Sequence, residues 1–140
     1  MTVNEIMIAL ARKLGELFPD RAVYYTQIPR EADGSHYIRC ISQSHTRKLG
    51  RRRERAYSFE ILCFCKERDA LMFNDWAETL YGELETLTVN GQLAHILGAH
   101  AQPGEDMVFH FVFDIALLGL TVPPEGQAME GLETKEELKA

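Results

Sequence analysis

The chain has little of several features that commonly identify the class of a protein. Its 140 residues hold only three cysteines, an odd number that argues against a disulfide framework and favours a reducing cytoplasm. No apolar run reaches the roughly 20 residues of a membrane span, because the longest one, 107–122, is interrupted by His110 and Asp114. The first residues lack the basic and apolar regions of a secretory signal. We therefore expect neither a membrane protein nor an exported one.

Motifs of catalysis and cofactor binding are also missing. The glycines form neither a phosphate-binding loop nor a dinucleotide fingerprint, and there is no Gly-x-Ser-x-Gly elbow. A zinc site of Cys63, Cys65 and His110 is disfavoured because the chain has no Cys-x-x-Cys spacing, so buried thiols are the better interpretation. Asp114, inside an apolar strand, is read as a buried hydrogen-bonded group or an interface ion-pair partner, with no second catalytic residue to join it. We expect no enzyme, no metal and no cofactor.

A surplus of positive charge is absent as well. The sequence has 15 Lys and Arg against 21 Asp and Glu, a net charge of −6, which disfavours a general nucleic-acid coat. The charge is unevenly distributed along the sequence. The segment 47–55 carries six basic residues and one glutamate, a net charge of 6 − 1 = +5, so the rest of the chain carries −6 − 5 = −11. The six basic residues are Arg47, Lys48, Arg51, Arg52, Arg53 and Arg55.

Two interpretations of this basic segment are open. As a solvated hairpin tip it would protect neighbouring strands from aggregation. As a cationic loop it would point at a negative surface, either DNA or an acidic patch of a neighbouring subunit. Five of the six cations are arginine, whose planar guanidinium suits bidentate contacts with carboxylate or phosphate.

The apolar spacing predicts two helices and five strands. Thr2 and Glu5 have the spacing of a capping box, and Asp69 is placed to cap the second helix. The odd-numbered residues of 57–65 and of 107–117 are apolar, which is the period of two of a strand. The expected elements are a helix over 6–18, strands over 22–28, 36–46 and 55–66, a helix over 68–86, and strands over 93–100 and 106–118.

This order predicts an α+β fold, a mostly antiparallel sheet of about five strands with both helices on one face. We expect one domain over 1–122 and an acidic, flexible tail over 123–140. The second face of the sheet is too apolar for water alone, so we expect it to form an oligomer interface. The apolar residues expected on that face are Leu62, Phe64, Val108 and Val112.

Taken together, several segments of the chain resemble the tail terminator proteins of tailed phages and prophages of Gram-positive bacteria. The likeness extends over roughly residues 1–133, and it rests on the order and spacing of the segments. They are the opening helix 6–18 followed by Val23-Tyr24, the run 37–41 leading into 48–55 and Tyr57-x-Phe59-x-Ile61, the run 106–111, and Met129-x-x-Leu132.

The resemblance implies a structural protein of the virion, at the junction of tail and neck, assembled in the host cytoplasm. Such proteins form rings, usually of six subunits, that cap the tail tube, stop its polymerisation and provide the surface for head–tail joining. The partners would be further copies, the tail tube protein and the neck proteins, with no membrane and no tight nucleic-acid binding. The basic segment would then contact a neighbouring subunit or the tube end. A head–tail connector and a small nucleic-acid-binding protein are the alternatives.

Overall fold

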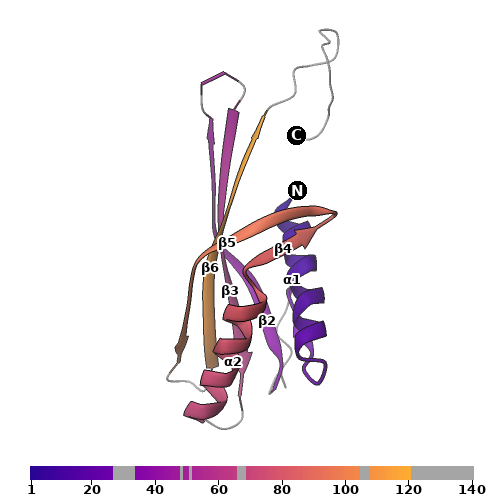
Figure 1. Ribbon diagram of the computed structural model, residues 1–140, viewed down its shortest axis with the longest axis vertical. Coiled ribbons are helices and arrows are strands. Elements are labelled where there is room, and N and C mark those ends of the chain that lie inside the picture. Colours follow the sequence, from indigo (N-terminus) through magenta and orange to yellow (C-terminus); the bar gives the residue numbers. More distant parts are fainter. Residues whose placement is uncertain (27–33, 48, 51, 66–68, 105–107, 121–140) are drawn as a thin grey trace.

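The structure is a computed structural model that describes residues 1–26, 34–47, 49–50, 52–65, 69–104 and 108–120, with the backbone alone at 52 and 118–120. These residues contain two helices and six strands, and the strands form one mostly antiparallel sheet with the order β1-β2-β3-β6-β5-β4 (Figure 1). The α+β class is confirmed. The elements are α1 (Val3–Leu17), β1 (Val23–Tyr24), β2 (His36–Arg47), β3 (Arg52–Phe64), α2 (Ala70–Glu83), β4 (Thr86–Val89), β5 (Gln92–Pro103) and β6 (Val108–Leu120).

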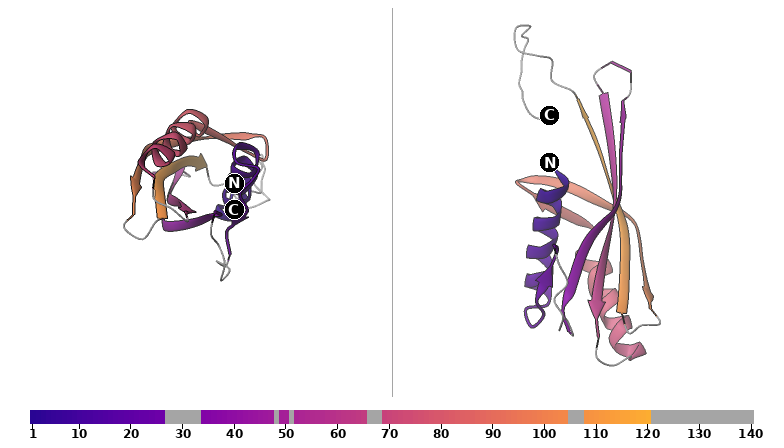
Figure 2. Two further views of the ribbon diagram at one scale, coloured as in Figure 1. Left: turned by 90° about the horizontal axis from the view of Figure 1, so that it is seen from below. Right: turned by 180° about the vertical axis from the view of Figure 1, so that it is seen from behind.

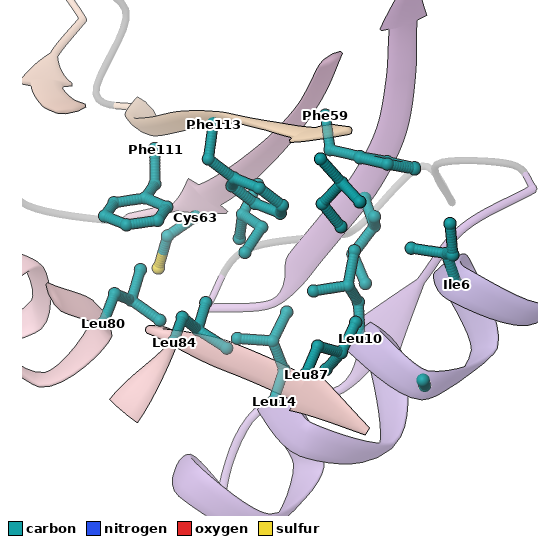
Figure 3. Packing of buried hydrophobic residues seen from close by; sticks show 14 of the residues in the cluster. Ile6, Leu10, Leu14, Phe59, Cys63, Leu80, Leu84, Leu87, Phe111 and Phe113 are labelled. Carbon is teal, nitrogen blue, oxygen red and sulfur yellow. The ribbon is translucent and has the colours of Figure 1, made fainter. Parts of the chain in front are cut away.

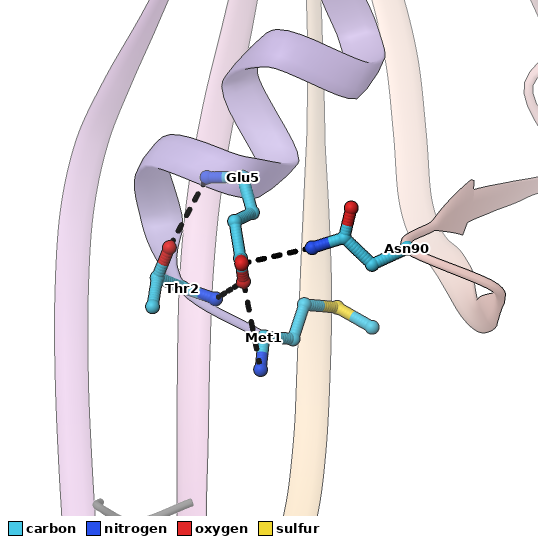
Figure 4. Close-up of polar contacts among 4 residues, drawn as sticks. All are labelled: Met1, Thr2, Glu5 and Asn90. Atoms are coloured by element: carbon cyan, nitrogen blue, oxygen red, sulfur yellow. Dashed lines mark hydrogen bonds and ion pairs between the residues drawn. The ribbon is translucent and has the colours of Figure 1, made fainter. Parts of the chain in front are cut away.

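The first helix begins at the predicted capping box. The Glu5 backbone N–H donates to the Thr2 hydroxyl at 3.2 Å, and the Thr2 backbone N–H donates to the Glu5 carboxylate at 2.8 Å (Figure 4). The same carboxylate accepts from the Asn90 side chain at 2.8 Å, which joins the start of α1 to the turn after β4. The backbone hydrogen bond from Thr2 is the main cause that lowers the pKa of Glu5.

Replacing Thr2 by alanine should lower the free energy of unfolding by about 1 kcal/mol, because an N–H at the start of α1 loses its acceptor. Urea unfolding followed by far-UV circular dichroism measures the change. Thr2→Ser keeps the hydroxyl and is the matched control, expected to lie within about 0.5 kcal/mol of the native protein. Equal losses in both variants would contradict the capping role.

Both helices pack on the same face of the sheet, as predicted. Ile6, Leu10 and Leu14 of α1 are fully buried, and so is Leu80 of α2. They meet the odd-numbered residues of β3 and β6, which form the apolar layer of the core (Figure 3). Those strand residues are Tyr57, Phe59, Ile61, Cys63, Phe109, Phe111, Phe113 and Ile115.

The end of α2 and the start of the next hairpin differ from the prediction. The helix ends at Glu83, short of the predicted residue 86, and residues 86–89 form a sixth strand, β4, that was not predicted. Val89 and Gln92 lie in the paired strands β4 and β5, so the turn is only Asn90-Gly91. Both turn residues have positive φ, 51° and 81°, as a two-residue type I′ hairpin requires.

The basic segment is mostly strand, which corrects the predicted loop. β2 continues to Arg47 and β3 begins at Arg52, so Arg47, Arg52, Arg53 and Arg55 belong to a ladder of paired strands. β6 follows β3 on its other side as far as Leu120. We call this three-stranded extension, Ser44–Arg47, Arg52–Ala56 and Ala116–Leu120, the arm, and it projects beyond both helices (Figures 1 and 2).

Other predicted boundaries shift by a few residues. β1 is only Val23–Tyr24, and β6 starts at Val108 and runs on to Leu120, where 106–118 was expected. The predicted acidic tail over 123–140 lies outside the described residues, as do residues 27, 28, 66, 106 and 107 of the predicted strands and residue 68 of the predicted second helix.

Candidate assembly surfaces

The arm gathers part of the predicted cationic set on one face. Arg47 lies directly opposite Arg53, and His45 directly opposite Arg55, on the face that carries the core further down the sheet. Arg47 is exposed, whereas Arg53 and Arg55 are half-buried. Within the part of the chain that the structure describes, none of these arginines forms an ion pair with a carboxylate. Lys48 and Arg51 lie outside the described residues.

This pairing of like charges is unfavourable for the isolated chain. Arginines directly opposite one another across an antiparallel pair destabilise it, by about 0.2–1 kcal/mol on the scale of cross-strand pairs. Their repulsion is relieved when an anionic surface lies across them. The arrangement therefore suits contact with a negatively charged partner better than it suits a free hairpin tip.

Helix α2 exposes several acidic side chains. Helix α2 contains no basic residue and exposes Asp75, Glu78 and Glu83, and Asp69 and Glu85 flank it. Lys13 of α1 approaches Glu83 at 3.8 Å and offsets one of these charges. Helix α2 lies at the end remote from the arm tip, so these acidic side chains are well separated from the arginines of the arm (Figure 1).

The outer face of the sheet, remote from the helices, carries a polar cluster on three neighbouring strands. Glu60 of β3 is only 8% exposed, and its two oxygens are held separately. Arg39 of β2 approaches one at 2.6 Å, and the Nδ1 atom of His110 of β6 lies 2.9 Å from the other. One row further along, the Ser58 hydroxyl donates to Asp114 at 2.6 Å. Asp114 is thus hydrogen-bonded as one interpretation proposed, but it is exposed and not buried.

The apolar residues predicted for an interface are partly covered within a single chain. Leu62 is 6% exposed and Val108 is 8% exposed, while Phe64 and Val112 are half-buried. Their placement on the outer face is as expected from the alternation, because Leu62 pairs with His110 and Phe64 with Val108. Leu62 and Val108 already have most of their surface removed from water in one chain, so Phe64 and Val112 have more surface left for a neighbour. Their role in an interface stays a prediction.

Among the described residues, the buried cysteines are not activated thiols. Cys63 and Cys65 are buried with their sulfur atoms 4.0 Å apart, and burial, followed by the neighbouring thiol, raises the pKa of Cys63 to about 12. Such a thiol stays protonated and is a poor nucleophile. The described residues contain no group of three His, Cys, Asp or Glu side chains able to hold a metal ion. Among the helices described, none has the length and apolar character to cross a membrane.

Fold and surfaces together define a class, a small α+β subunit with a projecting arm that carries arginines and with a helix that exposes acidic side chains, which suits assembly into a larger structure. The model of one protein family, described as phage tail terminator protein, matches residues 5–127. The chain therefore belongs to the phage tail terminator family, and this membership supports a tail-terminator role in the virion. The prediction of a Gram-positive host is not tested by this match.

Two further comparisons add no functional information. A search of curated proteins finds no match. One solved structure aligns with 89% of this chain and 99% of its own, at 12% identity and a TM-score of 0.46.

Proposed function

We propose that copies of this chain form a ring, of six subunits in the arrangement the resemblance implies, that caps the tail tube. The ring stops tube polymerisation and then presents its other surface to the neck proteins for head–tail joining. The family match over residues 5–127 is the observation that carries this proposal. The protein acts by binding and not by catalysis.

The charge distribution supports a ring with two unlike ends. Copies related by rotation about an axis along the molecule would place every arm at one end of the ring and every α2 at the other (Figure 1). One end would carry the arginines of the arms, and the other would carry the acidic side chains of α2. A protein that joins two different structures needs two different surfaces, and this polarity provides them.

The growth of tubes in solution tests the proposal. Adding the protein to tail-tube subunits that are polymerising should stop the rise in light scattering at well below one copy per tube subunit, because only tube ends are bound. Serum albumin at the same concentration is the control. Continued growth at the control rate with an equimolar amount would refute the proposed function.

Reversing charge on the arm should weaken capping without unfolding the chain. Arg53→Glu with Arg55→Glu removes the Arg47–Arg53 repulsion, so stability should hold or rise, while the net charge of 47–55 falls from +5 to +5 − 4 = +1. We expect half-maximal inhibition of tube growth to need about tenfold more protein, the equivalent of about 1.4 kcal/mol.

The matched control for this variant reverses the same number of positive charges at a different place. Lys13→Glu with Arg12→Glu reverses two cations on α1, far from the arm, and should leave capping within about twofold of the native protein. Capping unchanged by the arm variant, or weakened equally by both variants, would contradict a role for the arm.

A further inference from the structure

The arm has two strand edges without a partner strand among the described residues. On one side, β1 pairs with β2 only at His36 and Tyr37, so the edge of β2 is open from Ile38 to Arg47. On the other side, the pairing of β5 with β6 ends at Ile115, so the edge of β6 is open from Ala116 to Leu120. Each open edge presents backbone N–H and C=O groups that can pair with another strand.

The arm also lacks a core of its own. From Ser44 to Arg47 every side chain of β2 is exposed, and neither helix reaches this part of the sheet (Figure 2). Strand ribbons without an apolar face or a covering helix are marginal in water. An additional strand on each side would stabilise the arm through backbone hydrogen bonds, since the side chains of the arm do not stabilise it by packing.

The geometry points to a second copy of this chain as the occupant, and we propose that the β2 edge of one copy pairs with the β6 edge of the next. This proposal rests on the ring proposed above and names its subunit contact. The two edges lie on opposite sides of the same three strands, as a head-to-tail contact that closes into a ring requires.

The direction of the strands fixes how the copies meet. β2 and β6 each run antiparallel to β3, so they run in the same direction. Rotation about an axis along the arm preserves that direction, and the new pair of strands is therefore parallel. The shorter edge, Ala116–Leu120, limits the ladder to a length of about 16 Å. A symmetric dimer through two β2 edges would instead be antiparallel and would leave both β6 edges open.

Two features keep the pairing selective. A bulge between Cys40 and Ser42 interrupts the lower part of the β2 edge, which blunts indiscriminate strand addition. Collecting the arms of several copies also brings their arginines together, and this repulsion opposes ring formation until salt or an anionic tube end offsets it. The arginine-bearing face of the assembled arms then contacts the tube, and the strand edges form the subunit contact.

Engineered disulfides test this contact directly. Ser44, Ala56 and Ala116 form one row on the outer face, with β3 between the two outer positions. The Cα atoms of residues 44 and 116 in one chain are two strand spacings apart, about 9.6 Å. A disulfide spans at most roughly 7 Å between Cα atoms, so cysteines at these positions can bond only between copies. The double variant Ser44→Cys, Ala116→Cys is made in a Cys40→Ser background, and Ser42→Cys or Thr46→Cys replaces Ser44→Cys to sample neighbouring registers.

Mild oxidation of these variants on tubes of the tail-tube protein should give a ladder of linked chains that ends at the ring size. At least one of the three registers should convert most of the protein, and each single variant should stay monomeric on a denaturing gel. Without tubes, the yield should rise with salt, because the screening length falls from about 10 Å at 0.1 M to about 3 Å at 1 M.

The outcomes separate this proposal from the function on which it rests. Electron microscopy of the same samples before oxidation reports whether tubes are capped. Capped tubes with no ladder in any register, or dimers from Ser44→Cys alone, would overturn the edge contact and leave the capping function standing. Uncapped tubes would refute the capping function itself. A yield that falls with salt would show that arms bind acidic surfaces of neighbours and not each other's edges.

Discussion

Replacing Phe111 by alanine should lower the free energy of unfolding by about 3–5 kcal/mol, the range for removing a large aromatic side chain from a core. Phe111 is fully buried at the centre of the sheet. Its ring lies 5.3 Å from that of Tyr81, 5.9 Å from Phe113 and 6.3 Å from Trp76. The truncation therefore removes ring contacts between α2 and the sheet and leaves a cavity.

Urea unfolding, followed by the fluorescence of Trp76, measures this loss. Leu71→Ala is the matched control, because Leu71 lies on the same helix–sheet unit but is 72% exposed. Its cost should stay within about 0.5 kcal/mol. A loss below about 1 kcal/mol for Phe111→Ala would contradict the packing of α2 on β6 that the whole core depends on.

Acid should destabilise the protein through one buried histidine, by about 3 kcal/mol. His36 is fully buried between Phe18 and Trp76, and its Nε2 atom accepts a hydrogen bond from the Trp76 indole at 3.0 Å. Its Nδ1 atom has no hydrogen-bond partner among the described residues. Burial, and then the nearby Arg21 guanidinium, lower the pKa of His36 from 6.5 to about 4.

The direction of this pH dependence follows from which state, folded or unfolded, binds the proton on His36 more readily. In the unfolded chain His36 takes up a proton near its ordinary pKa of about 6.5, whereas the folded chain resists it until about pH 4. The contribution of neutral His36 to the free energy of unfolding is therefore fully present above about pH 6.5 and is lost as the pH falls toward 4. Unfolding free energies measured across this window should decline accordingly.

A variant that cannot titrate isolates this contribution. His36→Gln keeps an acceptor for the Trp76 indole but carries no ionisable group, so its stability should fall less between pH 7 and 4, by about 3 kcal/mol, than that of the native protein. Carboxylates elsewhere contribute equally to both proteins and cancel in the difference. Parallel pH profiles for the two proteins would show that His36 titrates normally in the folded state.

The strand alternation allowed most of the core to be predicted. Phe59, Ile61 and Phe111 recur at the period of two and face the helices as expected. The cap at Thr2 was also predictable, because its partner lies only three residues away. Such features depend on near neighbours in the chain, which a sequence displays directly.

The element boundaries that were not predicted from the sequence have physical causes. Leu80, Leu84 and Leu87 continue a helical spacing beyond Glu83, so the four residues of β4 resemble the end of α2. In the arm there is no core to impose alternation, and a run of arginines in a sequence is typical of a solvated loop. Yet an arginine backbone pairs as well as any other, so β2 and β3 extend into this segment.

The cluster on the outer face needed a register that no sequence pattern supplied. Arg39 lies opposite Glu60 across β2 and β3, and His110 contacts the same carboxylate from β6. Counting back from the hairpin tip would have misplaced Arg39, because the bulge between Cys40 and Ser42 shifts the pairing. The Arg47–Arg53 pair, by contrast, lies beside the tip, so its pairing can be predicted from the sequence wherever the turn itself is placed correctly.

The central claim is that this chain ends a tail tube, and electron microscopy of the protein mixed with its tail-tube protein tests it most directly. Tubes grown with the protein should be shorter and should carry a ring at one end only, while tubes grown alone should have bare ends and a broad range of lengths. Rings at one end, absent with the Arg53→Glu, Arg55→Glu variant at the same concentration, are the predicted result. Tubes of unchanged length with bare ends, or decoration along their sides, would contradict the account.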